Sequence, residues 1–345
     1  IAKFGYKKTA LIGLFVGIIG ILVQWLSGHV GKESAFLVYL IGAFITGFTM
    51  CILNCVVNPM LNLLGGGGNK GNQLIQIGGV FNSSAAVAVY IIMGALIGDA
   101  SKAHIADATP ALMIALAIFI IGFIVILFTK IQEPEQAPVD TSLIKGAMKY
   151  RHFVLGILAI FLYMGIEVGT PTYIRQYLSS APDATTPGLG MDAGIVGLIV
   201  AVYWLMMLVG RFVGGTIAGK ISSRKMITTV SIASIILVSF GMFAPTDITV
   251  SVPGIDWAKL ELIWAEVPIG IFAFLLVGLC TSVMWGGIFN MAVEGLGKYT
   301  AIASGIFMTM VFGCAVMVAI QGWLADLTTY MDSYWIVLFC AAYIL

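Results

Sequence analysis

The basic residues of this chain fall in every second gap between its long apolar stretches. Ten stretches are long enough to cross about 30 Å of hydrocarbon as helices, at residues 9–26, 36–64, 73–98, 110–129, 153–178, 190–218, 226–244, 267–291, 301–323 and 332–345. Twelve of the 17 basic residues lie in one alternate set of gaps: Lys3, Lys7, Lys8, Lys70, Lys130, Lys145, Lys149, Arg151, Lys220, Arg224, Lys225 and Lys298. The other set contains only Lys32, Lys102, Arg175 and Lys259. The positive-inside rule makes the first set cytoplasmic, which predicts an all-α integral membrane protein with both ends of this sequence inside.

The composition supports a membrane protein and argues against several other classes. Hydrophobic residues make up 60% of the chain and charged residues 10%, which is too apolar for a soluble domain. The formal net charge of +1 gives no electrostatic reason to expect a nucleic-acid partner. All five cysteines fall within apolar stretches, and the sequence shows no nucleophile–base pair and no metal-ligand spacing. We therefore expect no cofactor, no metal and no enzymatic activity.

Two short basic segments indicate an internal repeat. Residues 3, 7 and 8 are basic, and so are residues 220, 224 and 225, at a constant offset of 217. Each segment leads into an apolar stretch. We expect an N-terminal half at 1–130 that holds helices 3–6 of twelve, with the first two missing from this sequence. A cytoplasmic linker follows at 131–152, and then a C-terminal half at 153–345 with helices 7–12, the last one truncated. Two parallel six-helix halves form the major facilitator fold; the alternative is that short basic turns recur by chance.

Glu167 is the only acidic residue that the pattern places deep inside an apolar stretch. A charged side chain at mid-membrane costs about 2.5–3.5 kcal/mol on insertion scales, so it usually faces a cavity or a partner. We favour a functional role for it, either as an acceptor for ligand hydroxyls or as a group that exchanges a coupling proton when its access to water changes. The alternative is a protonated glutamate that is hydrogen-bonded to a neighbouring helix.

Several motifs along the chain resemble one family. The segment NPMLNLLG at 58–65 with FN at 81–82, LYMGIEV at 162–168, and YW at 203–204 with VGRFVG at 209–214 all follow its pattern. The same holds for IF at 288–289, EGLGK at 294–298 and QGWLAD at 321–326. Together, in order and over nearly the whole chain, they resemble the fucose and glucose/galactose–proton symporters of the major facilitator superfamily.

The resemblance implies import of a monosaccharide by alternating access, with a proton as the coupling ion. Two positions depart from the family pattern. Asn54 stands where members often carry a glutamate that is implicated in proton coupling. Gly286 and Gly287 replace a Pro-Thr pair, and we expect them to leave room for a larger ligand. The sequence alone therefore does not identify the coupling ion.

Amides and aromatic side chains supply the other candidate ligands. Asn54, Asn58, Asn82 and Asn290 offer donors and acceptors that suit a hydroxyl-rich ligand, and Asn82 also belongs to the family motif. Their alternative role is to bond helices to one another. Tyr163, one turn from Glu167, and Trp285 can pack on the C–H faces of a sugar and donate a hydrogen bond. Ordinary packing is the alternative for both.

Cations near the cytoplasmic side are candidate gating residues. Arg211 can close an inner gate by pairing with an acid or with helix carbonyls, or it can extend to phosphate headgroups. The remaining candidates are Lys3, Lys7, Lys8, Arg224 and Lys225.

The main interpretation is a secondary active transporter that imports fucose, glucose/galactose or a similar hexose, with proton symport as what the family resemblance implies. It would lie in the lipid bilayer of the cell inner (plasma) membrane as a multi-pass monomer, with both full-length termini cytoplasmic. The alternatives are a permease for an amino sugar or peptidoglycan fragment, a sugar uniporter, and a membrane sugar sensor that does not transport.

Overall fold

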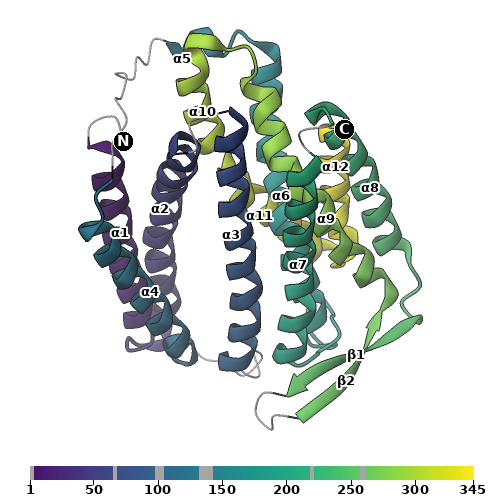
Figure 1. Cartoon of the computed structure of the whole chain (residues 1–345). Coiled ribbons are helices and arrows are strands. Elements are labelled where there is room, and N and C mark those ends of the chain that lie inside the picture. Colours follow the sequence, from purple (N-terminus) through teal and green to yellow (C-terminus); the bar gives the residue numbers. More distant parts are fainter. Residues whose placement is uncertain (1–3, 65–67, 98–104, 132–142, 218–220, 257–260) are drawn as a thin grey trace. The chain divides into compact units, whose positions relative to one another are not determined.

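The protein consists of apolar helices joined by short connections, with one β-hairpin (Figure 1). The computed structural model describes all residues except 1–3, 65–67, 98–104, 132–142, 218–220 and 257–260. The helices that precede residue 140 are α1 (Gly5–Ser27), α2 (Lys32–Leu64), α3 (Gly68–Ile97) and α4 (Thr109–Phe128). Those that follow are α5 (Leu143–Ala147), α6 (Arg151–Ser179), α7 (Ala193–Ile217), α8 (Ser223–Phe243), α9 (Ile269–Val293), α10 (Thr300–Thr309), α11 (Gly313–Leu327) and α12 (Trp335–Ile344).

The helices confirm the apolar stretches that the sequence predicts. Within the described residues, eight helices are long and apolar enough to cross a membrane. Two shorter apolar helices, Ile77–Met93 and Asp332–Ile344, fall in the third and tenth expected stretches. In the ninth stretch, a 3₁₀ turn at Met310–Phe312 separates α10 from α11. Hydrocarbon cannot hydrogen-bond the backbone, so each crossing segment must satisfy its own amides as a helix.

Two of the helices begin a few residues after the start of the stretch expected from the sequence. The sixth stretch begins at Ala193 instead of 190, because Gly190 adopts a φ of 62° and the Asp192 carboxylate accepts a hydrogen bond from the backbone N–H of Gly194 at 2.8 Å. That contact satisfies a free amide at the start of the helix. The eighth stretch begins at Ile269 instead of 267, because Val267 and Pro268 end a strand.

The β-hairpin between α8 and α9 was not predicted from the sequence. Its strands are β1 (Thr249–Asp256) and β2 (Glu261–Pro268), which pair antiparallel with Thr249 opposite Pro268. Along β2 the side chains at 262, 264 and 266 are exposed, whereas those at 263 and 265 are half-buried, which is the period of two that a half-covered strand shows. The inner face of the hairpin packs against α7, where Gly254 lies against Ile195.

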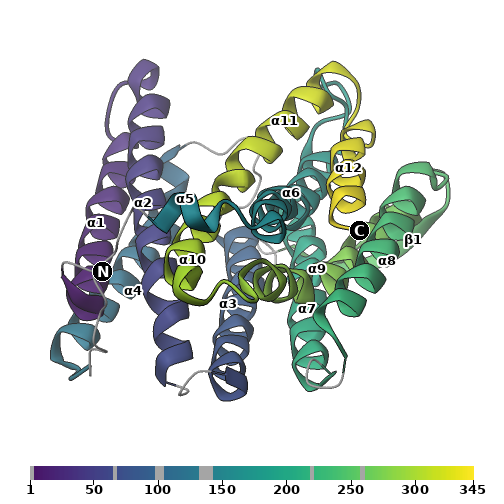
Figure 2. The same cartoon turned by 90° about the horizontal axis from the view of Figure 1, so that it is seen from above.

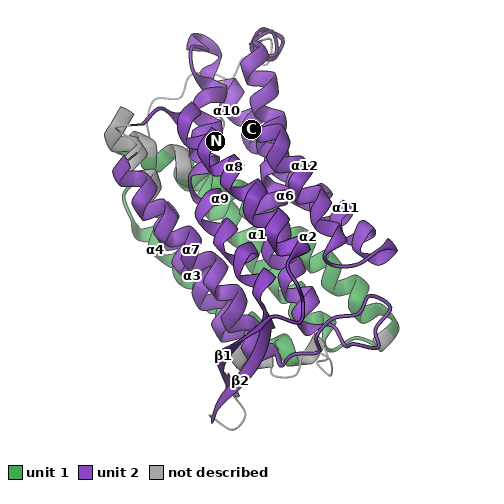
Figure 3. Ribbon diagram, turned by 90° about the vertical axis from the view of Figure 1, so that its right-hand side faces the viewer, with its two compact units in different colours: residues 1–78, 102–139 green, residues 79–101, 140–345 purple. Residues whose placement is uncertain are grey.

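The chain divides into two compact units (Figure 3). The first unit comprises residues 1–78 and 102–139, and in it α1 packs against α2 and α4. The second unit comprises residues 79–101 and 140–345. The second unit therefore includes the later part of α3 together with all helices from α5 onward.

Helix α9 is the centre of the second unit. It packs against α6, α7 and α8, which Figure 2 shows gathered around it. Fully buried aromatic side chains fill the space between these helices, including Phe274, which stacks on Tyr334 at a centroid distance of 4.0 Å. Small residues let the backbones approach. A Cβ atom at Gly278 of α9 would meet the carbonyl oxygen of Tyr203 in α7.

We predict that Gly278→Ala destabilises the second unit, because the added methyl group meets a backbone atom that cannot move aside. Overpacking of this kind costs about 1–3 kcal/mol, so the thermal unfolding midpoint in detergent falls. Gly305→Ala in α10 is the matched control, because no atom outside its own helix lies within 4 Å of the added Cβ. An equal fall for both variants would contradict the close approach of α7 and α9.

Candidate functional site

The site is built around a proline inside α6. Pro171 lacks the backbone N–H that would bond to the carbonyl oxygen of Glu167 one turn earlier. That carbonyl would be unsatisfied in an apolar bundle, but the Tyr203 hydroxyl of α7 donates to it at 3.1 Å. A tertiary hydrogen bond thus replaces a helical one, as helix breaks within membranes require.

Two tyrosines and a threonine connect the three helices at this level. The Tyr163 hydroxyl of α6 donates to the carbonyl oxygen of Thr281 in α9 at 3.1 Å. The Tyr203 hydroxyl also lies 3.3 Å from the hydroxyl of Thr281. All three side chains are fully buried. They hold α6, α7 and α9 in a fixed register around Glu167.

Glu167 pairs with Arg211. One carboxylate oxygen of Glu167 lies 3.6 Å from a guanidinium nitrogen of Arg211, and both side chains are 12% exposed. The pair joins α6 to α7. Buried charges are tolerated in a low-dielectric surrounding only when they are paired and hydrogen-bonded, and Arg211 is the charged partner of Glu167 in this structure.

Arg211 has further contacts on α3. One guanidinium nitrogen donates to the carbonyl oxygen of Gly79 at 2.7 Å and to the hydroxyl of Ser83 at 3.0 Å. A Cβ atom at residue 79 would lie 3.3 Å from that nitrogen, so glycine leaves room for the guanidinium. Arg211 therefore binds both an acid and a helix carbonyl, which are the two kinds of partner that an inner gate would use.

Trp204 lies next to Tyr203 on α7, and its indole nitrogen is buried. Its indole nitrogen has no hydrogen-bond acceptor among the described residues. Its ring stacks on Tyr90 of α3 at a centroid distance of 6.2 Å. An unpaired donor inside a bundle is costly, so Trp204 is a candidate to donate to a ligand.

Tyr203, Thr281, Ser83 and Trp204 are not among the site residues predicted from the sequence. One signal was available: Pro171 lies four residues after Glu167, so a free carbonyl at Glu167 could be inferred from the sequence. The residue that satisfies it could not be inferred, because it comes from another helix.

The predicted amides differ from this buried cluster in the exposure of their side chains. Asn82 in α3, Asn54 in α2 and Asn290 in the last turn of α9 have exposed side chains. The side chain of Asn58 lies outside the described residues. Exposure leaves the three described amides open to a ligand, and their assignment stays a prediction.

Trp285 and Gly287 lie in a packed region. Trp285 stacks on Phe289 and meets Phe307 edge-on. A Cβ atom at Gly287 would lie 2.9 Å from the Ile227 side chain of α8. The room that we expected at Gly287 is thus filled by Ile227, and it is not available for a larger ligand.

The basic gating candidates fall at different places. In the first unit, the ammonium group of Lys7 donates to the carbonyl oxygens of Leu127 and Thr129 at 3.0 and 2.8 Å, which satisfies the end of α4. Lys8 is exposed, and Lys3 lies outside the described residues. Arg224 and Lys225 begin α8 and are exposed.

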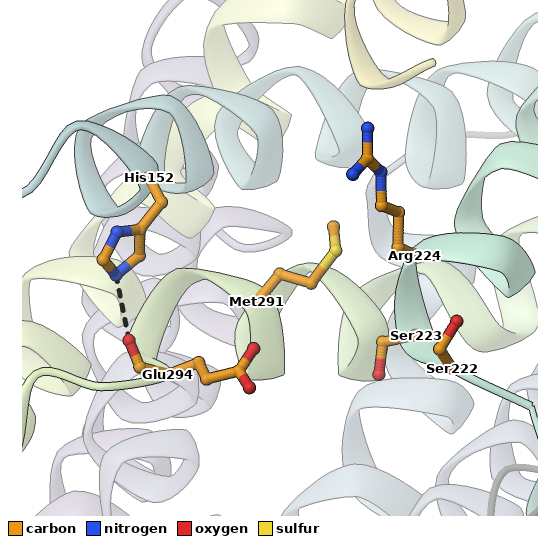
Figure 4. A pocket seen from close by; sticks show the side chains of 6 residues that line it. All are labelled: His152, Ser222, Ser223, Arg224, Met291 and Glu294. Atoms are coloured by element: carbon orange, nitrogen blue, oxygen red, sulfur yellow. Dashed lines mark hydrogen bonds between the residues drawn. The ribbon is translucent and has the colours of Figure 1, made fainter.

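Arg224 borders a cavity of about 550 Å³ that also involves α6 and α9 (Figure 4). His152 donates from its ring to the carbonyl oxygen of Glu294 at 3.0 Å on one wall, and Arg224 with Ser222 and Ser223 lies on another. This cavity lies at the helix ends, away from the intramembrane cluster. Among the described residues, no group of three or more His, Cys, Asp or Glu side chains could hold a metal ion.

The helical spans define a polytopic membrane protein, with a pair of opposite charges inside its helices. The sequence matches the Major Facilitator Superfamily over residues 1–320, and the chain belongs to that family. It belongs to a family of transporters and not of enzymes, as the sequence motifs predicted.

Named relatives agree with this assignment. The glucose/galactose transporter of Brucella abortus biovar 1 (strain 9-941) is 29% identical over 352 residues, which cover 100% of this chain and 78% of that protein. The L-fucose-proton symporter of Escherichia coli (strain K12) is 20% identical over 353 residues, which cover 94% and 73%. A crystal structure of the major facilitator transporter FucP in the outward conformation matches with a TM-score of 0.69 at 20% identity, covering 100% of this chain and 82% of that one. The major facilitator fold is thereby confirmed.

We predict that Tyr203→Phe destabilises the protein by about 1–3 kcal/mol, because it leaves the Glu167 carbonyl without a donor. The loss is smaller when Pro171→Ala is already present, since alanine restores the helical N–H. Thermal unfolding of the two single variants and the double variant in detergent measures this coupling. Strictly additive effects would show that Tyr203 does not substitute for the missing helical bond.

Proposed function

We propose that this protein imports a hexose, such as glucose, galactose or fucose, together with a proton. It does so as a monomer in the cell inner membrane, with the termini of the full-length protein in the cytoplasm. Its family and its similarity to a glucose/galactose transporter and an L-fucose-proton symporter support a sugar substrate. The observation that carries the mechanism is the ion pair between Glu167 and Arg211, which lies inside the apolar helices and is framed by Tyr163, Tyr203 and Thr281.

Glu167 is the proposed proton-coupling residue. A carboxylate can exchange a proton with water when the site opens to one side of the membrane, and in its charged form it pairs with Arg211. After protonation the attraction between the two side chains is lost, while Arg211 keeps its contacts to Gly79 and Ser83. Asn54 is neutral, so among the described residues Glu167 is the acid deep inside an apolar stretch that remains for coupling.

The sugar site is proposed beside this pair. Glu167 accepts from sugar hydroxyls, the Trp204 indole donates to one, and Asn82 supplies an exposed amide from α3. Tyr163 is the proposed aromatic residue next to Glu167; in this structure its ring is fully buried and its hydroxyl is bonded to α9. Alternating access then moves one half of the bundle against the other around this level.

We predict that the full-length protein accumulates one member of a labelled panel of fucose, glucose, galactose, mannose and N-acetylglucosamine, and that a protonophore abolishes the accumulation. Glu167→Gln keeps sugar counterflow but loses accumulation, because the amide cannot carry the proton. Asp183→Asn, which changes an exposed acid in a loop, is the matched control and keeps accumulation.

Each other outcome of the uptake assay indicates a different function. Uptake that equilibrates and ignores the protonophore indicates a uniporter. Binding of a sugar without uptake indicates a sensor. Accumulation by Glu167→Gln would exclude this carboxylate as the coupling group.

We predict that Trp204→Phe raises the KM for sugar uptake by about two- to tenfold, which is the range expected for loss of one neutral hydrogen bond. Trp285→Phe, measured in parallel, tests the sequence-based assignment of Trp285. Its ring packs between Phe289 and Phe307, so phenylalanine there keeps the KM near the wild-type value if the role is packing. An unchanged KM for Trp204→Phe would remove that residue from the site.

A further inference from the structure

A second cavity, of about 280 Å³, lies between α7 and α8 with α9 as its floor. Its walls are mainly apolar or small, with Gly210, Gly214 and Val213 on α7, Val230 on α8, and Leu279 and Val283 on α9. All of these residues belong to the second unit. None of them belongs to the intramembrane cluster of Glu167 and Arg211.

Glycines on α7 create this groove. A Cβ atom at Gly210 would meet the side chain of Ser282, and one at Gly214 would meet that of Val283, so α7 lies directly on α9 at both positions. Helix α8 also packs against α9, whereas α7 and α8 hardly touch each other. The two outer helices therefore leave a furrow above the shared floor.

The groove lies on helices that cross the membrane. The three helices α7, α8 and α9 are all long and apolar enough to span a bilayer. Val213, which lines the groove, is 49% exposed, and its neighbour Phe212 is 70% exposed. From residue 210 to residue 217 of α7 the groove extends about 10 Å along the helix axis, at 1.5 Å per residue. That length fits part of one acyl chain within one leaflet.

A cation marks one end of the groove. Lys225 lines it within the first turn of α8, and its side chain is exposed. Within the described residues no ion pair of Lys225 is present. The N-terminus of α8 lies at the same end and has no side-chain cap, so its amides add partial positive charge. Basic groups at the membrane end of a pocket between helices are the arrangement that binds anionic lipid headgroups.

We infer that this groove binds one anionic phospholipid, with an acyl chain between α7 and α8 and the phosphate at Lys225. Selection rests on the headgroup. An acyl chain gains little by leaving other lipids, because the lipid tails are as apolar as the groove. The charge of Lys225 must therefore decide which lipid occupies the groove. This site is independent of the sugar site and of proton coupling.

The test uses the purified full chain, stripped of lipid in detergent. Phosphatidylglycerol and phosphatidylcholine with identical acyl chains are added separately, and bound lipid is counted by native mass spectrometry. The wild-type protein prefers phosphatidylglycerol by about fivefold, the factor that corresponds to about 1 kcal/mol for one lysine near a membrane surface. Lys225→Gln loses this preference. Lys149→Gln removes an exposed charge from another basic gap and retains it. Equal preference in the Lys225→Gln and wild-type proteins would overturn the headgroup assignment.

A second pair of variants tests the acyl chain. Thr229 lines the groove on α8, so Thr229→Phe fills it and lowers the amount of bound phosphatidylglycerol. Ile232→Phe adds a similar bulk on the same helix at a residue that does not line the groove and is 44% exposed, and it leaves binding unchanged. Undiminished binding by Thr229→Phe would place the lipid elsewhere.

Discussion

The organisation of the second unit depends on one constraint: a polar group inside the membrane must find its partner within the protein. Pro171 breaks the hydrogen-bond ladder of α6 and frees the carbonyl of Glu167, and Tyr203 of α7 supplies the missing donor. The same tyrosine lies within hydrogen-bonding distance of Thr281 in α9. A local defect in one helix thus fixes the register of two others, and these three helices surround the carboxylate that carries the proposed function.

The charge pair links this arrangement of helices to the proposed mechanism. Glu167 and Arg211 stabilise each other in a surrounding where neither charge would be tolerated alone. Arg211 is also bonded to Gly79 and Ser83 of α3. A change in the charge of Glu167 therefore alters the forces on an arginine that contacts another helix. This is the kind of coupling between protonation and helix packing that a proton-driven transporter requires.

Much of the fold could be predicted because membrane insertion depends on local properties. The length of each apolar stretch, and the distribution of lysine and arginine between the stretches, can be read directly from the sequence. The hairpin at residues 249–268 was missed because this segment was treated only as a gap between two long apolar stretches. For the site, Glu167 stood out by its depth, whereas Tyr203, Thr281 and Ser83 did not, since single hydroxyl groups are common in membrane helices.

The sequence alone determined the class of protein, the spans and the buried acid, because these follow from hydrophobicity and charge along the chain. Only the tertiary structure decided which side chains meet that acid, and that the space beside Gly287 is filled by Ile227. It also decided that α7 and α8 separate above α9 to form a groove that ends at Lys225. These outcomes depend on helix packing between residues far apart in sequence, and no local pattern encodes which helix faces which.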